Sequence, residues 1–207
     1  MMKPFLSLNI LSILAGLFAL LPLTCIAAES IEDYVARAEK AFDESDIVNA
    51  MTYYRKAAEA GFGPAQNRLA YLLNISEENE EALEWYRKAA ATGSAEAEFY
   101  LAGMYAEGDG TAKDSGEALR LFNASANKGY APAVRVMAAA YEEGEMGLRV
   151  DYEAVREWLN KGVELNDSWS MKRLAKAHAN GELGLRIDRQ KAEQLEQRLA
   201  GLKKDSE

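Results

Sequence analysis

The chain carries a repeating block in which large apolar residues are followed by polar and then small ones. Residues 53–58 (Tyr-Tyr-Arg-Lys-Ala-Ala) recur closely at 85–90 (Trp-Tyr-Arg-Lys-Ala-Ala), and more loosely at 121–126 and 158–163. The block starts are 32, 36 and 37 residues apart, which is a period typical of helical repeat proteins. Eight residues after each start stands a residue that tolerates the left-handed conformation at a helix end: Gly61, Gly93, Gly129 or Asn166.

A second segment between these blocks has the spacing of a helix. A small residue is followed four positions later by a large apolar one, as in Ala97 and Leu101. Apolar positions four apart lie on one face of a helix, and they do not fit a strand. Glycines at positions 108, 144 and 181 are expected to end this helix. The next helix is predicted to begin at an aspartate N-cap, which is Asp46, Asp114, Asp151 or Asp188.

These patterns predict an all-α fold, a right-handed α-solenoid of stacked antiparallel helix pairs. No single pair can bury its apolar stripe alone, so neighbouring pairs must stack. We predict a signal peptide at 1–28, an N-terminal capping helix at 29–45, and a repeat solenoid that ends in a C-terminal capping helix at 46–207. The unit at 62–93 is short, because it lacks a glycine loop between Asn74 and Asn79.

The repeated residues resemble the Sel1-like repeat family, a relative of the tetratricopeptide repeat. The family pattern runs Ala-x3-Leu-Gly-x2-Tyr-x2-Gly, a loop, and then Asp-x2-Lys-Ala-x2-Trp-Tyr-x-Lys-Ala-Ala-x2-Gly. Its first half matches Ala97, Leu101, Tyr105 and Gly108, with Ala102 in place of a glycine, and its last part matches residues 85–93. The resemblance extends over about residues 46–200. It implies a module that binds other proteins on a concave surface lined by the first helix of each pair.

The first residues have the order of a secretory signal peptide. Lys3 precedes a nearly unbroken apolar run at 5–23, and Ala27 and Ala28 offer a small-residue cleavage site. We expect a periplasmic or secreted protein with no membrane span after cleavage, and an uncleaved anchor or a lipoprotein are the alternatives. Cys25, the only cysteine, lies in a poor match to the lipid-attachment motif. If Cys25 leaves with the signal, the remaining chain has no disulfide and no thiol nucleophile.

Charge and composition argue against several functions. The net charge of −9 disfavours non-specific binding to nucleic acid or to anionic membranes. His178, the only histidine, takes the position held by Tyr105 and Tyr141 in other units, so we expect a structural role rather than metal binding or general-base catalysis. Asp109 and Asp114 lack the ligand spacing of an EF-hand. We therefore expect no metal, no cofactor and no catalytic residue.

The first helix of each pair is expected to turn one face away from the core and toward a partner. Counting from the small residue at about 100° per position, positions +2, +6 and +9 point away from the core. This partner-binding face is predicted to hold Asn67, Tyr71, Phe99, Arg135, Lys172 and Lys176, with Trp169 nearby. Phe99 is predicted to be exposed. Positive charge gathers at one end, which would suit an extended or helical peptide with acidic residues. The alternative is that these are ordinary surface residues.

The sequence favours a non-catalytic extracytoplasmic adaptor or scaffold that binds a protein or peptide, as a monomer or a weak oligomer. A structural subunit of an envelope complex, held through its convex face, is a second possibility. An enzyme is the third, because some secreted Sel1 proteins with many paired cysteines have been linked to β-lactam binding and hydrolysis. That implication fails for this chain, which lacks those cysteines once the signal is removed. Fold alone does not choose among partners.

Overall fold

The computed structural model describes residues 29–204, which form ten α-helices and no β-strand. The helices are α1 (Ile31–Asp43), α2 (Ile47–Glu59), α3 (Gly63–Ile75), α4 (Asn79–Ala91), α5 (Ala95–Glu107), α6 (Ser115–Asn127), α7 (Ala131–Glu143), α8 (Tyr152–Glu164), α9 (Ser168–Asn180) and α10 (Arg189–Lys204). The predicted signal peptide at 1–28 lies outside the described residues. None of the ten helices is both long and apolar enough to cross a membrane.

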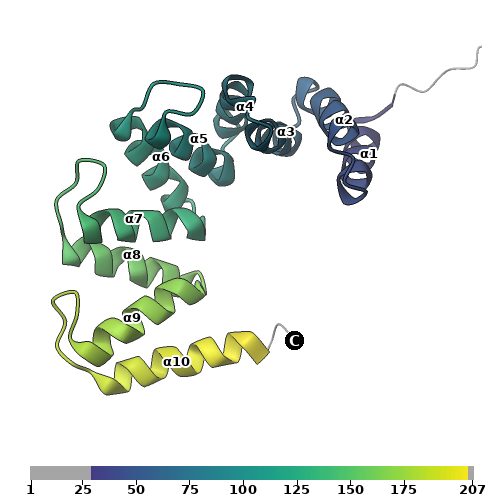
Figure 1. Cartoon of the computed structure of the whole chain (residues 1–207). Coiled ribbons are helices and arrows are strands. Elements are labelled where there is room, and N and C mark those ends of the chain that lie inside the picture. Colours follow the sequence, from purple (N-terminus) through teal and green to yellow (C-terminus); the bar gives the residue numbers. More distant parts are fainter. Residues whose placement is uncertain (1–28, 205–207) are drawn as a thin grey trace, which may run out of the picture.

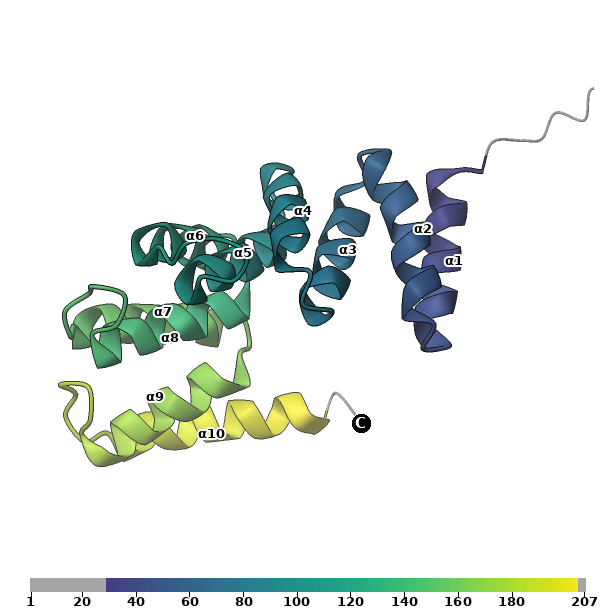
Figure 2. The ribbon, with the colours of Figure 1, turned by 45° about the horizontal axis from the view of Figure 1, so that its top comes forward.

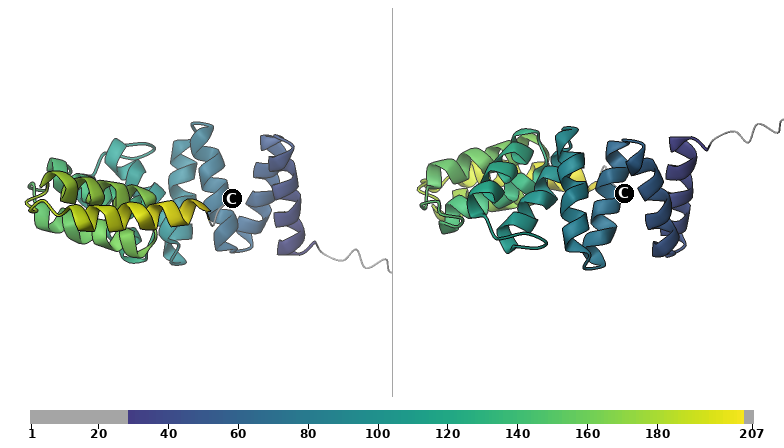
Figure 3. Two further views of the ribbon diagram at one scale, coloured as in Figure 1. Left: turned by 90° about the horizontal axis from the view of Figure 1, so that it is seen from below. Right: turned by 90° about the horizontal axis from the view of Figure 1, so that it is seen from above.

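Each helix packs against the next one along the chain, so the molecule is a curved array of helix pairs (Figure 1). The tightest contacts join α1 to α2, α3 to α4, α5 to α6, α7 to α8 and α9 to α10. Figures 2 and 3 show the same order of pairs from other directions, with α1 at one end of the array and α10 at the other. The predicted all-α solenoid of stacked helix pairs is confirmed.

The helices begin and end at the residues that the repeat pattern predicts. The side chains of Asp46, Asp114, Asp151 and Asp188 each accept a hydrogen bond from a backbone N–H in the first turn of the following helix. Such caps satisfy N–H groups that have no partner within the helix. Asn166 has a φ of 58° where the other units have glycine, so its predicted left-handed conformation is also confirmed.

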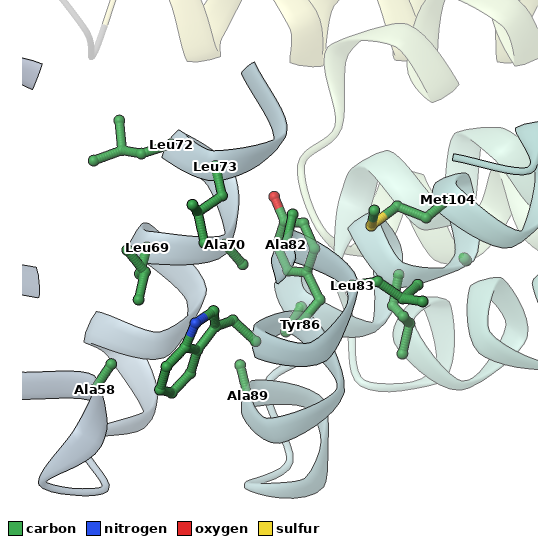
Figure 4. Close-up of a cluster of buried hydrophobic side chains, with 14 of the residues drawn as sticks. Ala58, Leu69, Ala70, Leu72, Leu73, Ala82, Leu83, Tyr86, Ala89 and Met104 are labelled. Carbon is green, nitrogen blue, oxygen red and sulfur yellow. The ribbon is translucent and has the colours of Figure 1, made fainter. Parts of the chain in front are cut away.

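The core consists of leucines and aromatic rings separated by alanines. Figure 4 shows Tyr86 between Leu73 of α3 and Met104 of α5, with Ala82 and Ala89 on the same helix as the tyrosine. All five side chains are less than 5% exposed. The small alanines let the helices approach closely enough for the large residues to fill the remaining space. The core therefore runs from one pair into the next instead of closing around each pair.

Candidate protein-binding surface

The seven residues predicted to face a partner all lie on the first helices of four consecutive pairs. They are Asn67 and Tyr71 on α3, Phe99 on α5, Arg135 on α7, and Trp169, Lys172 and Lys176 on α9. Their exposure is uneven: the α9 residues and Arg135 are exposed, Tyr71 and Phe99 are half-buried, and Asn67 is buried. The exposure predicted by counting about 100° per residue, the helical wheel, is therefore correct for the residues on α7 and α9 and wrong for those on α3 and α5.

Phe99 is not exposed as predicted, because the following helices cover it. Its ring contacts the rings of Tyr100, Phe122 and Tyr130, with centroid distances of 5.4, 5.5 and 5.3 Å. These tilted and edge-to-face geometries are favourable for aromatic pairs. Tyr100 in turn stacks on Tyr86 at 5.5 Å. The rings join α4, α5, α6 and the residue that precedes α7, so Phe99 holds consecutive pairs together and is not available as the floor of an open groove.

Asn67 is also covered, and the neighbouring pair again supplies the cover. Its side chain is 6% exposed, and its Nδ2 donates a hydrogen bond of 2.8 Å to Glu96 Oε2 on α5. Its Oδ1 has no hydrogen-bond partner among the described residues. The wheel places Asn67 away from the core of its own pair, but it cannot show that the start of α5 lies over this position.

Arg135 is exposed as predicted, yet its charge is already balanced. The Arg135 guanidinium forms an ion pair with Asp167, whose side chain is almost fully buried, and Nε lies 2.9 Å from Asp167 Oδ1. Burial would raise the pKa of the Asp167 carboxyl, but hydrogen bonds from Arg135 and Ser170 outweigh this effect and hold the pKa below its ordinary value. Arg135 therefore fixes the start of α9 on α7 and adds little free positive charge to the surface.

Lys172 and Lys176 line a groove between α9 and α10, which we call the basic groove. Its volume is about 370 Å³. Buried Met171 and half-buried Leu195 and Leu199 contribute its apolar lining. Both lysines are exposed, and Lys176 Nζ lies 3.8 Å from Glu182 Oε1. Exposed Glu196 is the one carboxylate in the lining, so the two lysines leave the groove with a net positive charge. The sequence pattern predicted the lysines but missed the two leucines, because it considered α9 without its partner helix.

A second hollow, which we call the N-terminal groove, lies between α1 and α3. It consists of two adjoining parts of about 280 and 650 Å³, and both are lined by Glu39, Tyr54 and Arg68. Tyr71 borders the smaller part and Asn67 the larger. Residues 29–45 were expected only to cap the solenoid, so the contribution of α1 to this groove was missed. No periodic signal marks it, since its walls come from three consecutive helix pairs, with Glu96 at the start of α5 in the lining of the larger part.

His178 has the buried position that the sequence predicts for it. It is 9% exposed, and its Nδ1 has no hydrogen-bond partner among the described residues. Within the same residues, no group of three His, Cys, Asp or Glu side chains is placed to hold a metal ion. Burial lowers the pKa of the His178 imidazole below its ordinary value of 6.5, and the charge of Lys191 acts in the same direction.

Because of this lowered pKa, we expect acid to destabilise the protein partly through His178. Well above its ordinary pKa of 6.5, the imidazole is neutral in both folded and unfolded states. As the pH falls below that value, the unfolded chain takes up a proton before the folded chain does, so the free energy of unfolding decreases by at most about 1.4 kcal/mol per pH unit. Urea unfolding of the wild type and of His178→Tyr at several pH values measures this contribution. Identical slopes for both proteins would contradict it.

The comparisons with known proteins agree with this architecture. A model described as Sel1 repeat matches residues 43–62, 63–94, 95–130, 131–167 and 170–200. No curated protein sequence matches the chain. A solved Sel1 repeat protein from Oxalobacter formigenes is 24% identical, with a TM-score of 0.72 over 82% of this chain and 70% of that one.

A second solved structure is c5321, a protective antigen of uropathogenic Escherichia coli strains that has an SLR fold. It is 29% identical with a TM-score of 0.71, and the match covers 83% of this chain but only 38% of that one. A sel1 repeat protein from Klebsiella pneumoniae is 21% identical with a TM-score of 0.53, over 82% of this chain and 86% of that one. The five matched repeats together account for most of the sequence, and the chain belongs to the Sel1 repeat family.

Proposed function

We propose that this chain is an extracytoplasmic adaptor that binds an acidic segment of a partner protein in the basic groove. Sel1 repeat proteins generally mediate protein–protein interactions and are typically non-catalytic. The observation that carries the proposal is the placement of Lys172 and Lys176 beside an apolar groove, in a chain of net charge −9. Long-range attraction between opposite charges speeds association, and the apolar lining adds binding energy that salt does not screen.

Export is part of the proposal and rests on the sequence of residues 1–28. A charged start, an apolar run and two alanines are the features by which secretory signals are recognised. Mass spectrometry of the protein purified from its native compartment would show whether the mature chain begins near Glu29. A chain that retains residue 1 would contradict the cleaved signal and would favour the anchored alternative.

Reversing the charge of the basic groove is expected to weaken partner capture about tenfold. Lys172→Glu with Lys176→Glu replaces two attractive contacts with two repulsive ones, and each exposed pair contributes up to about 1 kcal/mol. The matched control is Arg149→Glu with Arg186→Glu, because both arginines are exposed in the loops that follow α7 and α9. Crosslinking in the native compartment, followed by quantitative mass spectrometry, compares capture by the two double variants. Equal capture by both would remove the basic groove from the proposal.

One observation supports the alternative in which the second helices hold an envelope complex. Val48 on α2 is 76% exposed and borders a shallow hollow of about 460 Å³ together with Met51. If Val48→Asp abolishes assembly while the lysine variants leave it intact, a structural subunit is the better description. The opposite result favours the adaptor.

A further inference from the structure

The N-terminal groove has a charge opposite to that of the basic groove. Three carboxylates border its two parts, from Glu39 and Asp43 on α1 and from Glu96 on α5. Arg68 on α3 is the only cation among the residues that line it. No ion pair joins Arg68 to any of these acids in the part of the chain that the structure describes, which leaves the acids on the α1 side open to a ligand. A bound group would therefore meet a net negative wall.

Tyr54 lies where the two parts of the groove meet. It belongs to α2, borders both parts, and is only 5% exposed. Burial raises the pKa of its phenol; the charge of Arg68 opposes this shift, and the charges of Glu39 and Asp43 add to it. Glu39, Asp43 and Arg68 line the smaller part of the groove together with this buried ring. The groove is thus a single charged site with an aromatic base, although it comprises two hollows.

Asn67 lines the larger part of the groove and has a buried polar atom without a hydrogen-bond partner among the described residues. Its side chain is more than nine-tenths buried, and Oδ1 accepts no hydrogen bond from any described residue. Nδ2 donates one of its two N–H groups to Glu96, and the whole acceptor capacity of Oδ1 is left unused. Among the charged side chains that line the groove, three carboxylates (Glu39, Asp43 and Glu96) outnumber the single guanidinium of Arg68. A ligand that brings N–H donors would satisfy groups that the protein itself leaves unpaired.

Aromatic side chains border the same groove. Phe42 and Phe62 are 40% and 37% exposed, which is unusual for residues of their size, and half-buried Tyr71 lies beside Phe42 in the lining of the smaller part. Phe62 precedes α3 and borders the larger part. Aromatic faces attract both apolar groups and cations. Each part of the groove therefore has an exposed phenylalanine in its lining together with at least two carboxylates.

From this combination we infer that the N-terminal groove binds an extended peptide segment that carries an arginine or lysine next to an apolar residue. The cationic side chain lies between the carboxylates of Glu39 and Asp43, and the apolar neighbour packs against Phe42 or Phe62. An acidic segment is disfavoured here because it would face three carboxylates. The combined volume is in the range of sites that hold a few side chains. The site shares no residue with the basic groove and stands independently of the function proposed for it.

Binding of a defined peptide tests this assignment. The probe is a fluorescein-labelled peptide of sequence Gly-Phe-Arg-Phe-Arg-Gly, and its counterpart has glutamate in place of arginine. Fluorescence anisotropy with the full chain is expected to show binding of the arginine peptide only. Glu39→Gln with Asp43→Asn should weaken that binding about fivefold, since two exposed charge contacts are lost. Arg68→Gln should strengthen it about threefold by removing the opposing cation.

The control must separate this site from general attraction to an acidic protein. Glu157→Gln with Glu164→Gln removes the same charge from exposed positions on α8 and should leave the affinity unchanged. The gain expected for Arg68→Gln cannot come from damage to the fold. The inference is overturned if the arginine peptide does not bind, if the glutamate peptide binds equally well, or if both double variants weaken binding to the same extent. Weaker binding by Arg68→Gln would also overturn it.

Discussion

Replacing Gly162 with alanine is expected to lower the thermal unfolding midpoint by about 2–12 °C. Gly162 is buried in α8, and a β-carbon there would lie 2.0 Å from Ser170 Oγ and 2.5 Å from Ser170 Cβ on α9. Ser170 cannot turn away freely, because its Oγ and its backbone N–H both donate to buried Asp167. Overpacking of this kind costs about 1–3 kcal/mol, and each kcal/mol corresponds to about 2–4 °C in a domain of this size.

Gly103→Ala is the matched control for this variant. Gly103 also lies inside a helix, but a β-carbon there would meet no atom within 4 Å. Alanine favours the helix over glycine by up to about 1 kcal/mol, so this change should raise the midpoint. Adding Ser170→Gly to Gly162→Ala removes the clashing atoms and should recover part of the loss. If Gly162→Ala melts with the wild type in calorimetry, the close approach of α8 and α9 is wrong.

The contact between Gly162 and Ser170 is the last member of a repeated set of small-residue pairs. The equivalent pairs are Ala57 with Ala65, Ala89 with Ala97, and Ser125 with Ala133, and all of these residues are buried. In the last unit, Gly162 is smaller than its counterparts and Ser170 is larger than the alanine of the other units, so the pair as a whole stays small. The sequence predicts this feature well, because the small positions recur in every unit and indicate where one helix approaches the next.

Features that depend on a few neighbouring residues could be predicted from the sequence in the same way. Aspartate caps and left-handed turn residues act within one turn of a helix, so their spacing alone predicts the helix ends. The prediction was incomplete where the turn residue is neither glycine nor asparagine. Ser45 and Glu77 have φ angles of 61° and 64° and close the short connections that follow α1 and α3. Neither residue type suggests a left-handed conformation, so these turns carried no recognisable signal.

The candidate binding surfaces could be predicted only in part, because they depend on how consecutive units lie against each other. A helical wheel predicts which side chains leave the core of one pair, and this is correct for Lys172 and Lys176. It contains no information about the next pair, which covers Phe99 with Tyr130 and holds Asn67 with Glu96. The wheel is most reliable near the end of the array, where fewer neighbours remain to cover a face.

Gly110→Ala is the second change with a large expected effect, a loss of about 2–4 kcal/mol in the free energy of unfolding. Gly110 lies in the loop between α5 and α6 with a φ of +64°. A β-carbon there would lie 2.4 Å from the carbonyl oxygen of Asn79 and 2.8 Å from the backbone nitrogen of Glu80. These are backbone atoms at the start of α4, so no side-chain rotation relieves the clash. The left-handed conformation costs a further 1–2 kcal/mol, roughly, for a residue with a β-carbon.

Gly147→Ala separates the two causes, because Gly147 lies in the corresponding loop between α7 and α8. It has a φ of +83°, but a β-carbon there would meet no atom within 4 Å, so this variant should show the conformational cost alone. Urea unfolding measures the loss in the free energy of unfolding for each variant, and hydrogen exchange shows which helix is destabilised. The first hydrogen-bonded amides of α4, which begin at Ala82, should exchange faster in Gly110→Ala. They should exchange at the wild-type rate in Gly147→Ala, since only Gly110→Ala displaces a loop from this end of the helix. Equal losses in both variants, with no change at α4, would mean that the α5–α6 loop does not support the start of α4. The connection between α3 and α4 is short and lacks the glycine loop of the other units. The expected role of the α5–α6 loop is to cover the start of α4 at this place, and that role would then be wrong.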